Sequence, residues 1–301
     1  MSHRSGNGTV CRFRGLVLAG LAALATGLLV GTPPAADAQD APWRTGPLLG
    51  PAIAPVPFGP GELKTYDARL ARLRVGEGYM MVGQPEYVRG RRTYPLTMTI
   101  QGGIPLARVD DRMDSWLDIH TLTSYRFIQD LNQLRSSRYR AFEFYPDEGR
   151  YLQEGVEGDQ ELPSPDPLDD VSFLYYVRSL PLEVGHVYVM NRYFRETGNP
   201  VVVEVLRKDQ VTVPAGTFNT IVVRPIIRTS GLFGEGGEAE VHFSDDNRRL
   251  MVKMTSRVPI IGRLELHLKE VTYTRPLRAF DAASRAEAAL RYLSENGGDD
   301  G

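Results

Sequence analysis

Apolar and polar residues alternate along much of the chain, the pattern of strands with one buried face. In residues 263–269 leucines alternate with charged or polar side chains. Residues 238–243 and 250–258 alternate in the same way, and each collects its apolar side chains on one face. We therefore predict a mainly β domain over residues 61–276.

Turn-forming residues separate these predicted strands. Residues 244–247 read Ser-Asp-Asp-Asn, and residues 213–217 read Val-Pro-Ala-Gly-Thr, with proline and glycine where a type I turn favours them. Short strands joined by close turns predict an antiparallel meander.

One segment follows a helical pattern instead. Asp166 can cap a helix that has Pro167 at its first position and Pro181 just after its end. Its body, residues 171–180, is apolar in nearly every direction, with Arg178 as its only charge, which is typical of a buried helix. We predict a strongly curved antiparallel sheet, or an unclosed β-barrel, with this one central helix in its concave face.

The N-terminus has the features of a secretory signal peptide over residues 1–38. Arginines without any acid precede the apolar run Leu16–Val30, and small residues stand at Ala36 and Ala38. We predict cleavage between Ala38 and Gln39, export to the periplasm, and a mature chain without a transmembrane span. A membrane anchor is the alternative, but the apolar run is short for a span and contains glycines.

The ends of the mature chain are predicted to differ from its centre. Residues 39–60 are rich in proline and predict an extended linker. Residues 277–301 predict a short helix and a loose tail. The single cysteine, Cys11, precedes the apolar run, so the mature chain has no thiol for a disulfide, a nucleophile or a metal site.

Composition and charge narrow the range of functions. The chain has 301 residues, 42% of them hydrophobic, with 35 basic and 37 acidic side chains and a net charge of −2. These values are typical of a folded domain, and they give no support for a nucleic-acid partner.

No motif for a catalytic centre, a metal or a cofactor is found. The histidines of the mature chain, His120, His186, His242 and His267, lack metal-binding spacing, and we expect His242 and His267 to be solvated on polar strand faces. Serine-nucleophile, phosphate-loop and dinucleotide signatures do not occur. We therefore assign no catalytic residue, no metal and no cofactor.

Carboxylates give a weak alternative. If residues 109–119 form a strand, Asp110, Asp114 and Trp116 share a face. Residues four apart in a strand lie about 13 Å from each other, farther than the roughly 5–9.5 Å of glycosidase acid pairs. A salt-bridge ladder on a solvated face is the favoured interpretation, with Trp116 as a partly buried packing residue.

The helix offers the best candidate ligand site. Tyr175, Tyr176 and Arg178 could line an apolar cavity in the concave face. The favoured alternative is that the helix fills the concavity, in which case Arg178 should pair with an acid, for which we propose Asp110 or Asp114.

Several ordered motifs resemble an exported bacterial family catalogued as domain of unknown function 3108. The resemblance spans roughly residues 57–275, and its motifs are residues 57–67, 109–118, 166–170, 173–178, 180–182 with Gly185, 213–218, 231–233 and 244–250. It implies a periplasmic, mostly β protein with an architecture similar to the unclosed barrels of lipoprotein carriers. It implies no catalytic residue.

Three functions stay open at this point. The first is a non-enzymatic envelope protein that binds an apolar or amphipathic ligand, such as a lipid, or an envelope protein partner. The second is a hydrolase of envelope glycans or esters that uses carboxylates. The third is a scaffold or interaction module without a small ligand.

Overall fold

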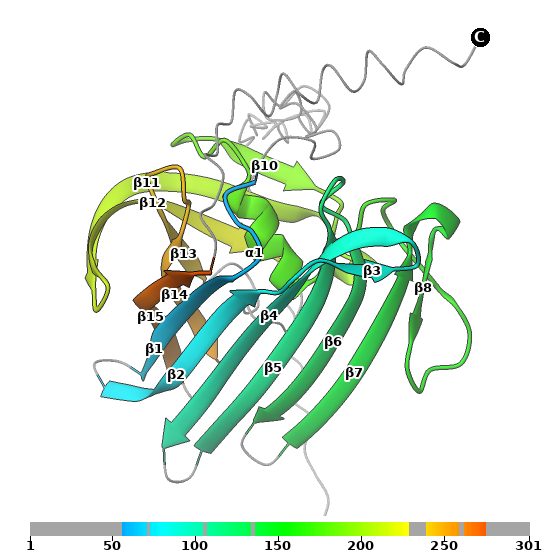
Figure 1. Ribbon diagram of the computed structural model, residues 1–301, viewed down its shortest axis with the longest axis horizontal. Coiled ribbons are helices and arrows are strands. Elements are labelled where there is room, and N and C mark those ends of the chain that lie inside the picture. The colour runs from blue at the N-terminus through cyan, green and yellow to red at the C-terminus, as the bar shows by residue number, and fades with distance from the viewer. Residues whose placement is uncertain are drawn as a thin grey trace, which may run out of the picture. The chain divides into compact units, whose positions relative to one another are not determined.

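The computed structural model describes residues 56–70, 73–104, 107–133, 136–228, 239–258 and 262–274 (Figure 1). The predicted signal peptide and its Ala38–Gln39 cleavage point, residues 39–55 of the linker, and the C-terminal helix and tail lie outside these ranges. Within them, no helix is both long and apolar enough to cross a membrane.

The described strands form an antiparallel sheet of 15 strands. From one edge to the other the strand order is β10-β11-β12-β13-β14-β15-β1-β2-β4-β5-β6-β7-β8-β9, and β3 pairs with β4. The strands that precede the helix are β1 (Glu62–Leu70), β2 (Leu73–Val82), β3 (Glu86–Val88), β4 (Arg91–Ile104), β5 (Ala107–Asp118), β6 (Ser124–Gln133), β7 (Ser136–Tyr145), β8 (Arg150–Gln153) and β9 (Gln160–Glu161). The strands that follow it are β10 (Val187–Met190), β11 (Val201–Val213), β12 (Gly216–Ile226), β13 (Glu240–Ser244), β14 (Met251–Val258) and β15 (Gly262–Tyr273).

This topology confirms the predicted open antiparallel sheet with one helix. The edge strands β9 and β10 do not pair with each other, so the sheet is not closed into a barrel. The helix α1 (Asp170–Arg178) lies between these two strands in the chain and packs on the sheet (Figure 1). Two short 3-10 turns, Pro146–Glu148 and Glu196–Gly198, complete the regular elements of the described ranges.

The helix begins later than the sequence predicts. Asp169 is its N-cap, not Asp166, because the Asp169 carboxylate accepts from the backbone of Val171 and Ser172 while the Ser172 hydroxyl accepts from the backbone of Asp169. This reciprocal capping box fixes the first turn. Upstream, Leu168 is extended and forms a parallel bridge with Tyr193. All nine residues of α1 are buried, which confirms the prediction of a buried helix.

We call the side of the sheet on which α1 packs the inner face. Because side chains alternate along the strands, the main core lies on this face. Its buried side chains, from neighbouring strands, include Met80, Leu96, Met98, Met113, Phe127 and Phe142. The opposite, outer face is mostly polar. Both predicted turns, at residues 213–217 and 244–247, are present.

His242 and His267 are not solvated, contrary to the prediction. His242 is only 6% exposed, and its Nδ1 lies 3.4 Å from the hydroxyl oxygen of Thr220. Burial lowers the pKa of His242. His267 is largely buried beside Glu265. Alternation shows which face a side chain occupies, but not whether neighbouring residues cover that face.

Candidate functional site

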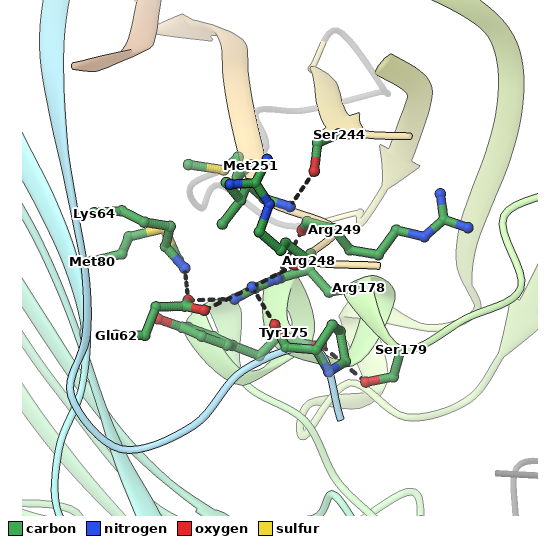
Figure 2. Close-up of polar contacts among 12 residues, drawn as sticks. Glu62, Lys64, Met80, Tyr175, Arg178, Ser179, Ser244, Arg248, Arg249 and Met251 are labelled. Carbon is green, nitrogen blue, oxygen red and sulfur yellow. Dashed lines mark hydrogen bonds and ion pairs between the residues drawn. The ribbon is translucent and has the colours of Figure 1, made fainter. Parts of the chain in front are cut away.

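Charged side chains gather at both ends of α1. At its C-terminal end, Arg178 meets Glu62 and Lys64 of β1, and we call these three residues the closed cluster (Figure 2). Glu62 and Lys64 point to the inner face because they are two residues apart in a strand. The side chains of Glu62 and Lys64 are 0% exposed and that of Arg178 is 1% exposed.

All three nitrogens of the Arg178 guanidinium have hydrogen-bond acceptors. Its Nη1 donates to Glu62 Oε1 at 2.7 Å and its Nη2 to Glu62 Oε2 at 3.0 Å, a bidentate pair. Nη2 also lies within hydrogen-bond distance of the backbone carbonyls of Pro57 (2.7 Å) and Arg248 (3.0 Å), and Nε donates to that of Arg249 (2.9 Å). One side chain thereby ties together β1, the segment before it and the β13–β14 turn.

The segment that leads into β1 seals this cluster. Phe58 is only 3% exposed, and its ring packs edge-on against Tyr175 with 4.9 Å between the ring centroids. Pro57 and Gly59 are also buried. The described end of the predicted linker, residues 56–60, is therefore packed against the domain.

The closed cluster contains two bases and one acid. Burial raises the pKa of Glu62, but the charges and hydrogen bonds of Arg178 and Lys64 outweigh burial and lower that pKa to about 2. Burial, together with the charge of Arg178, lowers the pKa of Lys64 to about 7. Glu62 and Arg178 form the main ion pair, and Lys64 carries the surplus charge, which deprotonation can remove near neutral pH.

The three predicted ligand residues do not face one common space. Tyr175 and Arg178 point into the closed cluster, where the Lys64 ammonium nitrogen lies 4.7 Å from the centroid of the Tyr175 ring. Tyr176 instead packs under Arg192, with 4.4 Å from the guanidinium carbon to the ring centroid. The buried Tyr175 hydroxyl has no hydrogen-bond partner among the described residues. Ligand binding by Tyr175, Tyr176 and Arg178 stays a prediction.

Arg178 pairs with a different acid from the one expected. Asp110 and Asp114 lie on the outer face of β5, where Asp110 accepts from Gln101 at 2.9 Å. Asp114 pairs with Arg112 of the same strand at 2.6 Å and, among the described residues, not with a charge on a neighbouring strand. Trp116 on the same face is partly buried, as expected, and its indole nitrogen donates to Glu86 at 2.9 Å.

The N-terminal end of α1 holds two buried acids. Asp169 accepts from the Ser115 hydroxyl at 2.6 Å in addition to its capping bonds. Asp170 accepts from Gln129 at 3.1 Å and from the Tyr193 hydroxyl at 3.2 Å. Burial, then the neighbouring charge of Asp169, raises the pKa of Asp170 to about 6. Hydrogen bonds to protein groups engage both carboxylates.

Beyond Gln129 the inner face carries arginines. Arg140 lies opposite Gln129, and Arg138 lies opposite Leu131, in the pairing of β6 with β7. Arg195 approaches from the loop after β10, with its guanidinium carbon 5.0 Å from the centroid of the Phe142 ring. We call Arg138, Arg140 and Arg195 the arginine patch. None of the three forms an ion pair with an acid in the part of the chain that the structure describes.

Sequence reasoning missed Glu62, Lys64 and the arginine patch. The signal for the patch was available: Arg138 and Arg140 continue the same alternating face as the buried Phe142 and Phe144. No comparable local signal marks Glu62 and Lys64. Among the described residues, no group of three or more His, Cys, Asp or Glu side chains could hold a metal ion.

Comparison with known proteins gives a family and distant structural likenesses. A family model described as protein of unknown function (DUF3108) matches residues 65–269. No curated protein matches the chain. Solved structures similar to it include a candidate lipoprotein from Parabacteroides distasonis ATCC 8503, at 11% identity and a TM-score of 0.32, covering 73% of this chain and 99% of that one. A candidate exported protein with a YmcC-like fold from Bacteroides fragilis NCTC 9343 has 10% identity, a TM-score of 0.29 and the same coverage, 73% and 99%. Likenesses of this strength establish neither function nor localisation.

Proposed function

Since the chain belongs to the DUF3108 family of proteins of unknown function, its role must be inferred from its own residues, and we propose a non-enzymatic protein of the bacterial cell envelope. In this proposal residues 1–38 direct export and are removed before Gln39, which leaves the mature chain in the periplasm. There it binds an amphipathic ligand on the inner face of the sheet, beyond the N-terminal end of α1.

One observation carries the ligand part of the proposal. Strands β4–β7 continue past α1 (Figure 1), and there Val109 and Leu131 of the inner face are only partly buried. Both lie beside the main core, so apolar surface extends from the core toward solvent at this end of the sheet. An apolar surface with a few converging polar groups is the usual form of a ligand site.

The buried carboxylates favour a structural role over a catalytic one. Asp169 is engaged by the helix cap and Ser115, and Asp170 by Gln129 and Tyr193. Asp110 and Asp114, the acids considered for a hydrolase, lie on the outer face and bind Gln101 and Arg112. These contacts support the non-enzymatic proposal.

Native mass spectrometry of the mature chain from its own periplasm tests this function. We expect a bound mass of lipid size that organic extraction removes. Leu131→Asn should lower the bound fraction, whereas Leu73→Asn, at a residue 72% exposed elsewhere in the sheet, should not. A mass equal to that of the ligand-free mature chain, together with no binding of added decanoate or decanol, would contradict the proposal.

The filled centre of the fold favours one alternative, a scaffold or interaction module without a small ligand. Tyr175 is 0% exposed and Tyr176 is 7% exposed, which supports a helix whose aromatic side chains complete the core. Ligand-free protein that co-purifies with one envelope protein at fixed stoichiometry would support this alternative.

A further inference from the structure

We propose that the arginine patch binds the anionic group of the ligand, which makes the ligand an amphipathic anion with a carboxylate or phosphate head and an aliphatic tail. This inference rests on the proposed function and adds the chemical class of the ligand.

The backbone brings the three arginines together. Arg138 and Arg140 alternate with Tyr139 on β7 and share the inner face with Phe142. The Arg195 guanidinium carbon lies 5.0 Å from the Phe142 ring centroid and 4.9 Å from that of Phe194. Phe142 thus lies between Arg140 on its own strand and Arg195 from the loop.

Arg140 is repelled by Arg138 and Arg195, and the patch has no counterion among the described residues. Burial first, and then the charges of Arg138 and Arg195, lower the pKa of Arg140. Elsewhere in the described chain most arginines near strands meet an acid, as Arg126 meets Glu143 at 2.5 Å and Arg224 meets Glu204 at 3.3 Å. A bound anion would supply what the patch lacks, since guanidinium groups match carboxylates and phosphates well.

The buried acid Asp170 does not fill this role. The charge of Arg195 acts to lower the pKa of Asp170. The Asp170 oxygens nevertheless accept hydrogen bonds from Gln129 and Tyr193, and Asp170 forms no ion pair with Arg195 in the described part of the chain. Burial and Asp169 also raise the pKa of Asp170 to about 6, which weakens it as a counterion near that pH.

The surface beside the patch fits an aliphatic tail. Leu131 lies directly opposite Arg138, and Asp111 pairs with Leu131 on the next strand, with its carboxylate held by Asn132 and Gln133. Val109 follows on the same face of β5. Side chains directly opposite each other in a sheet have Cβ atoms about 5 Å apart. An anionic head at the arginines would therefore place the first carbons of a tail on Leu131.

Titration calorimetry with decanoate, decyl phosphate, decanol and inorganic phosphate tests the inference on the mature chain. We expect decanoate and decyl phosphate to bind at least about tenfold more tightly than decanol, the effect of one charge-assisted hydrogen bond. Inorganic phosphate alone should bind far more weakly than decyl phosphate, because it lacks the tail.

Variants separate the head from the tail. Arg138→Gln/Arg140→Gln should bring decanoate to the affinity of decanol and leave decanol unchanged. The matched control is Arg91→Gln/Arg92→Gln, which removes the same charge from exposed positions of β4 and should keep the preference. The single variant Arg138→Gln, at an exposed residue, should show a partial loss if the double variant does not fold.

The outcomes distinguish the two proposals. If decanol and decanoate bind wild type equally, or if the double variant keeps the preference, the arginine inference is wrong and the proposed function stands. If no aliphatic compound binds, the proposed function is wrong. Binding of inorganic phosphate as tight as that of decyl phosphate would overturn the amphipathic ligand class and leave a simple anion site.

Discussion

The C-terminal and N-terminal ends of α1 both lie among charged side chains, but their environments differ. At the C-terminal end, Glu62, Lys64 and Arg178 are almost fully buried and bonded to one another or to backbone carbonyls. Past the N-terminal end, Arg138 is exposed, and Arg140 and Arg195 are partly exposed, with no acid paired to them in the described chain.

This difference separates charges that hold the fold from charges available to a ligand. A buried charge with a full set of partners stabilises one arrangement, and loss of a partner is costly because the remaining charge has no solvent. Partly exposed arginines that repel one another contribute little to stability, but they have unused capacity to bind an anion. The predictions below test this division, beginning with the largest expected effect.

Removal of the single acid from the closed cluster should have the largest effect. Glu62→Gln leaves Lys64 and Arg178 as buried cations without a counterion, and we expect a loss of about 3–5 kcal/mol in the free energy of unfolding. Arg178→Met should cost less, because Glu62 keeps Lys64 as a partner. Urea unfolding measures both variants.

The matched control is Glu77→Gln, at an acid 58% exposed that pairs with Arg74 and Lys269. It should leave the free energy of unfolding almost unchanged, because an exposed ion pair contributes little. Equal costs for Glu62→Gln and Glu77→Gln would show that the closed cluster does not hold the fold.

Phe58, which covers the closed cluster, should contribute almost as much to the free energy of unfolding. Phe58→Ala removes a buried ring that packs on Tyr175, and such truncations cost about 3 kcal/mol or more. We also expect faster hydrogen exchange at the backbone amides of residues 62–66, measured by mass spectrometry. Unchanged exchange there would mean that the segment before β1 does not protect the cluster.

Lys64 should make stability depend on pH. Its pKa is lowered to about 7 in the folded chain, whereas an unfolded lysine titrates near 10.4. Between these values the unfolded chain holds more protons, so raising the pH stabilises the folded state, by up to about 1.4 kcal/mol per pH unit for one proton.

Lys64→Met should remove this slope. The free energy of unfolding of the variant, relative to that of wild type, should therefore be highest near pH 7 or below. This relative gain should disappear toward pH 9 in urea unfolding. Lys269→Met, at a residue 46% exposed, should keep the wild-type slope. Parallel pH profiles for wild type and Lys64→Met would disprove the lowered pKa.

Asp169→Ala should have an intermediate effect at the N-terminal end. It removes the helix cap, which usually contributes about 1–2 kcal/mol, and it leaves the Ser115 hydroxyl without its acceptor. Asp166→Ala, at the residue that the sequence predicts as the cap, should cost less, because its side chain is 47% exposed. Thermal unfolding followed by circular dichroism compares the two, and a larger cost for Asp166→Ala would place the cap there.

Local pattern was enough to predict much of the fold. Alternating Leu264, Leu266 and Leu268 marked a strand, and the turn residues marked the β11–β12 and β13–β14 connections. The apolar circumference of α1 predicted its burial. Each of these inferences needs only the spacing of residues within one element.

The closed cluster could not be predicted in the same way. Glu62 and Lys64 alternate with Leu63 and Thr65, which indicates a solvated polar face on β1. Their burial depends on Arg178, which is distant in the sequence and meets them only because β1 lies at the centre of the sheet. A buried Arg178 predicts an acidic partner, but only the strand order identifies that partner as Glu62.

The arginine patch should show the smallest effect on stability. Arg138→Gln/Arg140→Gln removes two charges that have no acidic partner, and Arg140 is repelled by both Arg138 and Arg195, so we expect a change within about 0.5 kcal/mol, as for ordinary surface substitutions, or a small gain. Urea unfolding without ligand measures it, and repetition with decanoate should stabilise wild type more than the variant, because only a native state that binds the ligand gains from it. A loss of several kcal/mol without ligand would mean that the patch holds the fold like the closed cluster, and the division between the two ends of α1 would fail.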